Sequence, residues 1–137
     1  MTISSLLKLY AVALPTFLVI DLVWLGFIAR SFYRTHLGHL MRANVNWVAA
    51  VVFYLVFVAG IVVLVVWPAI EQQSLVRALS LGALFGLVTY AAYDLTNLAV
   101  LEGFSLKIAL VDLLWGTVLC AGVSAITYSV WARLLVN

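Results

Sequence analysis

The chain has 137 residues, of which 67% are hydrophobic and only 9% are charged, and its formal net charge is +2. Soluble domains carry about 25% charged residues, so most of this protein's surface must face an apolar environment, which is the interior of a lipid bilayer. The basic residues are spread along the chain and form no patch, which argues against a nucleic-acid partner. Anionic headgroups of membrane lipids are their expected partners.

Four apolar segments are long enough to cross a bilayer, because about 20 helical residues span a hydrocarbon core of about 30 Å. We expect these spans at about residues 5–29, 46–67, 76–99 and 106–131. Pro15 is expected to kink the first span, and Trp67-Pro68 to end the second. The short connections leave no room for a second domain. The prediction is one transmembrane domain over residues 1–137, with the all-α fold of an integral membrane four-helix bundle.

A histidine pair could hold a metal ion, whereas the single cysteine cannot form a thiolate site, and we interpret both features as structural. His36 and His39 lie in the segment between the first two spans without a third ligand nearby, so an interfacial amphipathic segment is the favoured interpretation. Cys120 is the only cysteine and lies within an apolar span, where it is expected to be a small packing residue. Motifs for nucleotides, zinc proteases or serine nucleophiles do not occur. We therefore expect neither a metal nor another cofactor.

The basic residues also suggest an orientation. With four spans, both chain termini lie on the same side of the membrane. Arg30, Arg34 and Arg42 make the first loop, residues 30–45, the most cationic connection. By the positive-inside rule we expect a multi-pass protein of the cell inner membrane, with this loop in the cytoplasm and both termini outside.

Three acidic residues fall inside the predicted spans, where a carboxylate is costly unless it is neutralised or paired. At 1.5 Å per residue, Asp21 lies about 13 Å, and Asp94 and Asp112 about 9 Å, from the same membrane surface. Tyr54 reaches that level from the second span, about 12 Å deep. All three carboxyls therefore belong to one leaflet, and they cannot all stay ionised there. We expect Asp112 to be the anion, and Asp94 or Asp21 to hold a proton.

The third span carries several polar residues on one face. Tyr90, Asp94 and Asn97 recur at i, i+4 and i+7, and the same face continues through Gly82 and Gly86. Small residues at this spacing let another helix approach closely. This face is therefore predicted to pack into the bundle.

An Asp-x-x-Trp element occurs in both the first and the fourth span, and it places an acid and an indole on one helix face. An indole can cover a carboxyl from lipid while donating its N–H. Together with the tyrosines at the same depth, these elements predict an intramembrane cluster that binds a substrate or a proton. Its members are Asp21, Trp24, Tyr54, Tyr90, Tyr93, Asp94, Asn97, Asp112 and Trp115.

Several short motifs follow one another in a specific order. They are Asp21-Leu-Val-Trp-Leu-Gly26, Phe32-Tyr33, Leu37-Gly38, Phe53-Tyr54, Pro68-Ala69, Tyr93-Asp-Leu-Thr-Asn97 and Asp112-Leu-Leu-Trp-Gly116. This order resembles a bacterial membrane-protein family catalogued as domain of unknown function 2177. The resemblance covers almost the whole chain and implies a multi-span membrane protein without an established activity. Members of that family lie near genes for modifying unsaturated fatty acyl chains, which hints at lipid chemistry.

Three hypotheses of function follow. The favoured one is that the cluster binds or helps process a lipid or fatty-acyl amphiphile, with Asp94 and Asn97 binding or protonating it and Tyr54 and Tyr90 orienting it. The second is a small proton-coupled transporter or channel that works as a homo-oligomer. The third is a structural partner of another membrane protein, in which the acids only fix helix register through hydrogen bonds. Whether the protein is an enzyme stays open.

Overall fold

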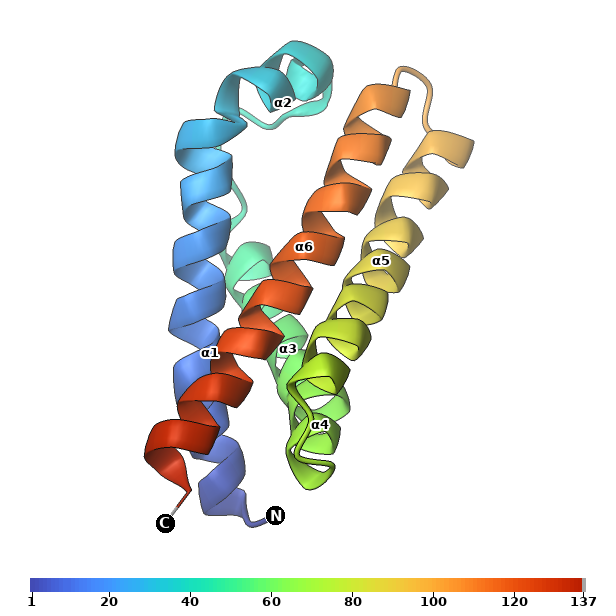
Figure 1. The fold of residues 1–137 in the computed structure, drawn as a ribbon. Coiled ribbons are helices and arrows are strands. Elements are labelled where there is room, and N and C mark those ends of the chain that lie inside the picture. Colours follow the sequence, from blue (N-terminus) through green and yellow to red (C-terminus); the bar gives the residue numbers. More distant parts are fainter. Residues whose placement is uncertain (137) are drawn as a thin grey trace.

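The computed structural model describes residues 1–136, which contain helices and turns and no strand. Four helical stretches are long and apolar enough to cross a membrane, and they alternate in direction along the chain (Figure 1). Their bounds are Ile3–Ile28, Trp47–Glu71, Leu75–Val100 and Leu106–Leu135. The predicted all-α four-helix fold is confirmed, and each end lies within four residues of the predicted one.

The first span begins with α1, Ile3–Val23, and ends in a π-helical turn, Trp24–Ile28. The hydroxyl of Thr2 caps the start of α1 by accepting a hydrogen bond from the backbone N–H of Ser5. The helix continues through Pro15 without interruption. The wide turn follows shortly after Asp21, and such turns often accompany functional sites.

The second span consists of α3, Trp47–Ile61, a π-helical turn, Val62–Val66, and α4, Trp67–Glu71. The prediction that Trp67-Pro68 ends this span was wrong, because the helix continues to Glu71. Proline lacks an N–H, but Pro68 lies in the first turn of α4, directly after the wide turn, where its missing N–H costs little.

The third and fourth spans, α5 (Leu75–Val100) and α6 (Leu106–Val130), lie side by side along their length (Figure 1). A further π-helical turn, Trp131–Leu135, extends α6. On α5 the buried residues are Ala78, Gly82, Gly86 and Asp94. The predicted packing face of this span is therefore confirmed.

Glycines bring the two backbones together. A Cβ atom added at Gly82 would lie 2.7 Å from the carbonyl oxygen of Cys120, and one added at Gly86 would overlap the carbonyl of Gly116. No side chain larger than hydrogen fits at these two positions without moving a helix. Cys120 itself is a buried free thiol in this contact.

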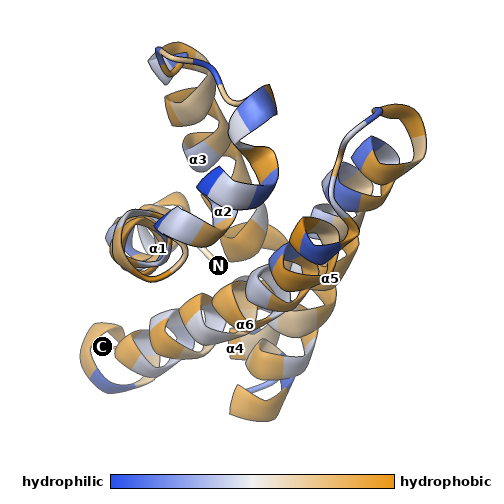
Figure 2. Cartoon of the chain, turned by 90° about the horizontal axis from the view of Figure 1, so that it is seen from above, coloured by the Kyte–Doolittle hydropathy of each residue, from blue (hydrophilic) through white to orange (hydrophobic). Residues whose placement is uncertain are grey.

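A short amphipathic helix, α2 (Arg30–Leu37), covers the end of the bundle opposite the chain termini (Figure 1). Its apolar residues Phe32, Tyr33 and Leu37 pack against the start of α6, around Ile108. Seen from above, hydrophilic residues gather at this end, on α2 and on the connections beside it, in contrast to the apolar spans (Figure 2). The amphipathic character that the sequence predicted for this segment is present in the structure.

The two histidines of this segment contact backbone carbonyls. Nδ1 of His36 lies 2.9 Å from the carbonyl oxygen of Phe32, one helical turn earlier. Nε2 of His39, in the 3₁₀ turn Gly38–Leu40, lies 2.9 Å from the carbonyl oxygen of Gly103. The second contact joins the α2 end of the chain to the loop between α5 and α6.

The main hydrophobic core fills the half of the bundle near the termini. Its buried residues come from three of the four spans: Leu9, Ala13, Phe17, Val58, Ile61, Val62, Val66, Leu119, Cys120 and Val123. The half nearer α2 contains the three carboxyls of the spans instead, whereas the buried hydroxyls of Ser124 and Thr127 lie toward the termini. The fold thus separates a mainly apolar core from a half that contains these three carboxyls.

Candidate functional site

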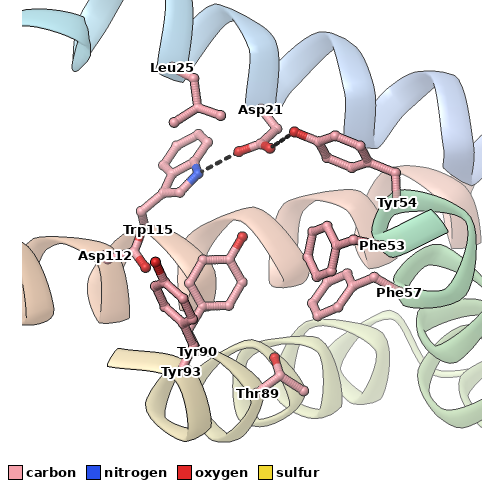
Figure 3. A pocket seen from close by; sticks show the side chains of 10 residues that line it. All are labelled: Asp21, Leu25, Phe53, Tyr54, Phe57, Thr89, Tyr90, Tyr93, Asp112 and Trp115. Carbon is pink, nitrogen blue, oxygen red and sulfur yellow. Dashed lines mark hydrogen bonds between the residues drawn. The ribbon is translucent and has the colours of Figure 1, made fainter. Parts of the chain in front are cut away.

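The carboxyl of Asp21 joins three spans. Its Oδ2 accepts a hydrogen bond of 2.9 Å from the hydroxyl of Tyr54 on α3, and its Oδ1 accepts one of 3.1 Å from the indole N–H of Trp115 on α6 (Figure 3). Asp21 is only 5% exposed. Both oxygens act as acceptors, which is the arrangement that an ionised carboxylate requires.

A second network ties α2 to the spans. The hydroxyl of Tyr33 donates to Oδ1 of Asp112 over 2.8 Å and accepts from the indole N–H of Trp24 over 3.3 Å. Burial raises the pKa of the Tyr33 hydroxyl, so this group stays a donor at neutral pH. The indoles of Trp24 and Trp115 stack, with centroids 4.3 Å apart and planes inclined by 8°. This stack connects the Asp112 network to the Asp21 network.

A cavity of about 410 Å³ lies between these networks, and all four spans contribute to its wall. Its lining residues are Asp21, Leu25, Phe53, Tyr54, Phe57, Thr89, Tyr90, Tyr93, Asp112 and Trp115 (Figure 3). Seen from above, α3 and α5 diverge at the α2 end, and both helices line the cavity (Figure 2). The cavity is thus built where the packing of α3 against α5 is incomplete.

A shallow apolar groove on α3 adjoins the cavity. It starts at Asn46, the residue that caps α3, and reaches Phe53 and Phe57, which belong to the cavity as well. Asn46 marks the membrane-surface end of the second span. The groove therefore connects the level of the lipid headgroups with the buried site.

Asp94 is placed differently from the other two acids. Its side chain is 0% exposed, and no hydrogen-bond donor among the described residues reaches either of its oxygens. Asp112 on α6 is the neighbouring carboxyl, and no hydrogen bond joins the two side chains. A buried carboxyl without a donor is favoured in its neutral, protonated form. Of the two residues expected to hold a proton, the geometry favours Asp94 over Asp21.

Asp94 and Asn97, for which the sequence predicted binding roles, do not line the cavity. They share a helix face with Tyr90, but this face is turned toward α6. The ring of Tyr90 lies directly on Gly116 of α6, where a Cβ atom on residue 116 would overlap the ring. Because Gly116 has no side chain, the Tyr90 ring can extend beyond the α5–α6 contact into the cavity. The shorter side chain of Asp94 stays between the helices.

The structure brings most of the nine predicted residues together. Six line the cavity, namely Asp21, Tyr54, Tyr90, Tyr93, Asp112 and Trp115. Trp24 stacks on this wall, Asp94 lies near Asp112, and Asn97 lies beside Tyr93 without lining the cavity.

The sequence interpretation omitted Tyr33 and the lining residues Leu25, Phe53, Phe57 and Thr89. Tyr33 and Phe53 were present in the motifs of the family resemblance, which was the one available signal for them. Concerning metals, residues 1–136 contain no group of three His, Cys, Asp or Glu side chains arranged to hold an ion.

Comparison with known proteins agrees with the fold. The model of a family described as a predicted membrane protein, domain of unknown function 2177, matches residues 6–129. The chain belongs to this family. The match includes both networks and the whole cavity lining. Searches of curated proteins and of solved structures found no match.

Proposed function

We propose that the protein binds the polar end of a lipid or fatty-acyl amphiphile in the cavity between its spans and helps to process or present it. The observation that carries this proposal is the cavity of about 410 Å³ at the level of Asp21 and Asp112. Ligand sites in proteins typically occupy about 300–1,000 Å³, with apolar walls and a few fixed polar groups. This cavity has that size and composition.

The surroundings of the cavity suit a ligand that arrives through the membrane. The wall is shared by α3 and α5, which diverge toward the headgroup level, and the groove from Asn46 to Phe57 leads there. A lipid can enter sideways along this route and leave its chain in the bilayer. A water-soluble substrate has no need of such an entrance.

The lining residues divide into two roles under this proposal. Asp21 is held by Tyr54 and Trp115, so it fixes the wall and supplies a fixed negative charge. Asp112 uses one oxygen for Tyr33, which leaves the other oxygen for a ligand or for Asp94. Carboxyl and phenol groups can transfer protons. Processing of the ligand therefore needs no further group for a proton-transfer step.

Filling the cavity tests this proposal. In the variant Thr89→Trp, a large ring from α5 occupies the space, whereas in Val88→Trp the same ring points to lipid, because Val88 is 59% exposed. Native mass spectrometry in mild detergent should show a retained amphiphile on the wild type and on Val88→Trp, and none on Thr89→Trp. Equal retention by both variants, or no adduct on the wild type, contradicts the proposal.

A second candidate, a proton-coupled transporter, is favoured by the buried Asp94. A carboxyl without any donor, next to a second carboxyl, is a place where a proton can be taken up and released. Four helices enclose little volume, so such a transporter would work as a homo-oligomer. Proteoliposomes with a pH gradient should then show flux that Asp94→Asn abolishes. Flux independent of the gradient excludes this candidate.

For orientation, we propose a cell inner membrane location with residues 30–45 in the cytoplasm and the termini outside, on the basis of Arg30, Arg34 and Arg42. The loops before α5 and after it lie at opposite ends of that helix. In a Cys120→Ser background, Gln72→Cys should react with a membrane-impermeant maleimide in intact cells, and Glu102→Cys should react only after lysis. The reverse pattern inverts the orientation.

A further inference from the structure

The wall of the cavity contains two carboxyls and no basic side chain. Asp21 and Asp112 are two of its ten lining residues, and none of the ten is Lys, Arg or His. The basic side chains of Arg30 and Arg34 line a separate pocket, which shares Leu25 with the cavity. A carboxylate in the membrane interior normally faces a cation or another fixed partner. The lining itself supplies only neutral donors.

The rest of the wall is aromatic. Six rings surround the space, from Phe53, Tyr54, Phe57, Tyr90, Tyr93 and Trp115. The rings of Phe57 and Tyr90 meet edge to face with centroids 6.1 Å apart, so they present surfaces in different directions. The faces of aromatic rings attract cations, and the attraction is stronger where water is excluded. Rings together with carboxylates form the chemistry that recognises a positively charged nitrogen.

Other headgroups fit the wall less well. A phosphate or carboxylate would approach two acids and find no basic side chain. A hydroxyl group could hydrogen bond to Asp112, but it would leave the negative charge of Asp21 without a counter-charge. The arrangement thus selects by the sign of the charge.

We propose that the cavity recognises an amphiphile whose headgroup is a cationic nitrogen, an amine or a quaternary ammonium, attached to an alkyl or acyl chain. This inference rests on the proposed binding function and names its ligand class. The nitrogen lies among the rings, close to Asp112 and Asp21. The chain leaves between α3 and α5 into the bilayer.

Three probes with the same chain separate the possibilities: hexadecyltrimethylammonium, hexadecanol and hexadecyl phosphate. The purified protein in an alkyl maltoside is offered all three at equal concentration, and adducts are counted by native mass spectrometry. The cationic probe should exceed the neutral one by about tenfold, the size of effect that a desolvated cation–π contact gives. The phosphate should bind least.

Two variants locate the preference. Asp112→Asn should reduce the ratio of cationic to neutral adducts severalfold while hexadecanol still binds, which shows that the cavity has remained folded. Glu71→Gln is the matched control, because Glu71, like Asp112, accepts a hydrogen bond from an aromatic side chain, the indole N–H of Trp67 over 2.7 Å, but lies at the other end of the second span. Its ratio should equal that of the wild type.

The outcomes separate this inference from the proposed function. If hexadecanol or hexadecyl phosphate binds as well as the cation, or if Asp112→Asn and Glu71→Gln behave alike, the cationic ligand is excluded although a binding cavity remains. If the wild type retains none of the three probes, the binding function fails as well.

Discussion

The two sides of α5 are built in opposite ways. Toward α6, the helix approaches so closely that Gly82 and Gly86 contact backbone atoms of the partner. Toward α3, it contributes Thr89, Tyr90 and Tyr93 to the wall of a cavity. One side fixes the position of the helix and the other leaves room. A helix held firmly on one side can present a preformed site on the other.

The chain connections explain this difference in part. The segment between α5 and α6 is short, residues 101–105, and Gly103 adopts a positive φ of 79° that allows its tight turn. The first and second spans are joined through α2 and a longer irregular segment. The short turn holds α5 and α6 together at the α2 end. The second span is joined to α5 by residues 72–74, at the opposite end, so α3 can diverge from α5 toward α2.

Disrupting the close contact between α5 and α6 should have the largest effect on stability. A methyl group added by Gly86→Ala overlaps the carbonyl of Gly116, so α5 and α6 must separate. We expect a loss of about 3 kcal/mol in the free energy of unfolding, at the upper end for overpacking. Thermal unfolding in detergent, followed by tryptophan fluorescence, measures it.

The control for this substitution is Gly122→Ala on α6. A Cβ atom at Gly122 would meet nothing within 4 Å, so the same chemical change should alter stability by less than about 1 kcal/mol. If both variants are equally stable, the close contact with α6 does not fix the position of α5.

Removing the central acid should have an intermediate effect. Asp21→Ala leaves the hydroxyl of Tyr54 and the indole N–H of Trp115 without their acceptor. We expect a loss of about 1–2 kcal/mol in the same unfolding measurement. In Asp21→Asn an amide oxygen still accepts one bond, so its loss should be smaller. If Asp21→Ala is more stable than the wild type, Asp21 lowers the free energy of unfolding, and its role is in binding and not in stability.

Hydropathy alone was sufficient to predict the four spans, because the lengths of apolar helices follow bilayer thickness. Depth along each helix also placed Asp21, Tyr54 and Asp112 in one layer, since helical rise converts residue number into distance. The end of the second span was misplaced because the π-helical turn Val62–Val66 precedes Pro68. A single sequence gives no sign of such a turn.

Side-chain direction was harder to predict than depth. The spacing of Tyr90, Asp94 and Asn97 identified the face of α5 that packs in the bundle. It did not show that Tyr90 alone of the three lines the cavity. That outcome depends on Gly116, one helix away. Tyr33 was missed because its contact with Asp112 requires α2 to fold back over α6, across 79 residues of sequence.

Removing the hydrogen bonds between α2 and the cavity wall should have the smallest effect on stability. This change tests what holds α2 next to the cavity. Tyr33→Phe removes the hydroxyl that joins Trp24 to Asp112, while the ring can still pack near Ile108. Each lost hydrogen bond in a membrane protein averages about 0.6 kcal/mol, so stability should fall by about 1 kcal/mol or less. Hydrogen exchange of α2 amides should nevertheless accelerate, because α2 loses its polar tie to the spans. Unchanged exchange would show that the apolar contacts of α2 alone hold it over the cavity.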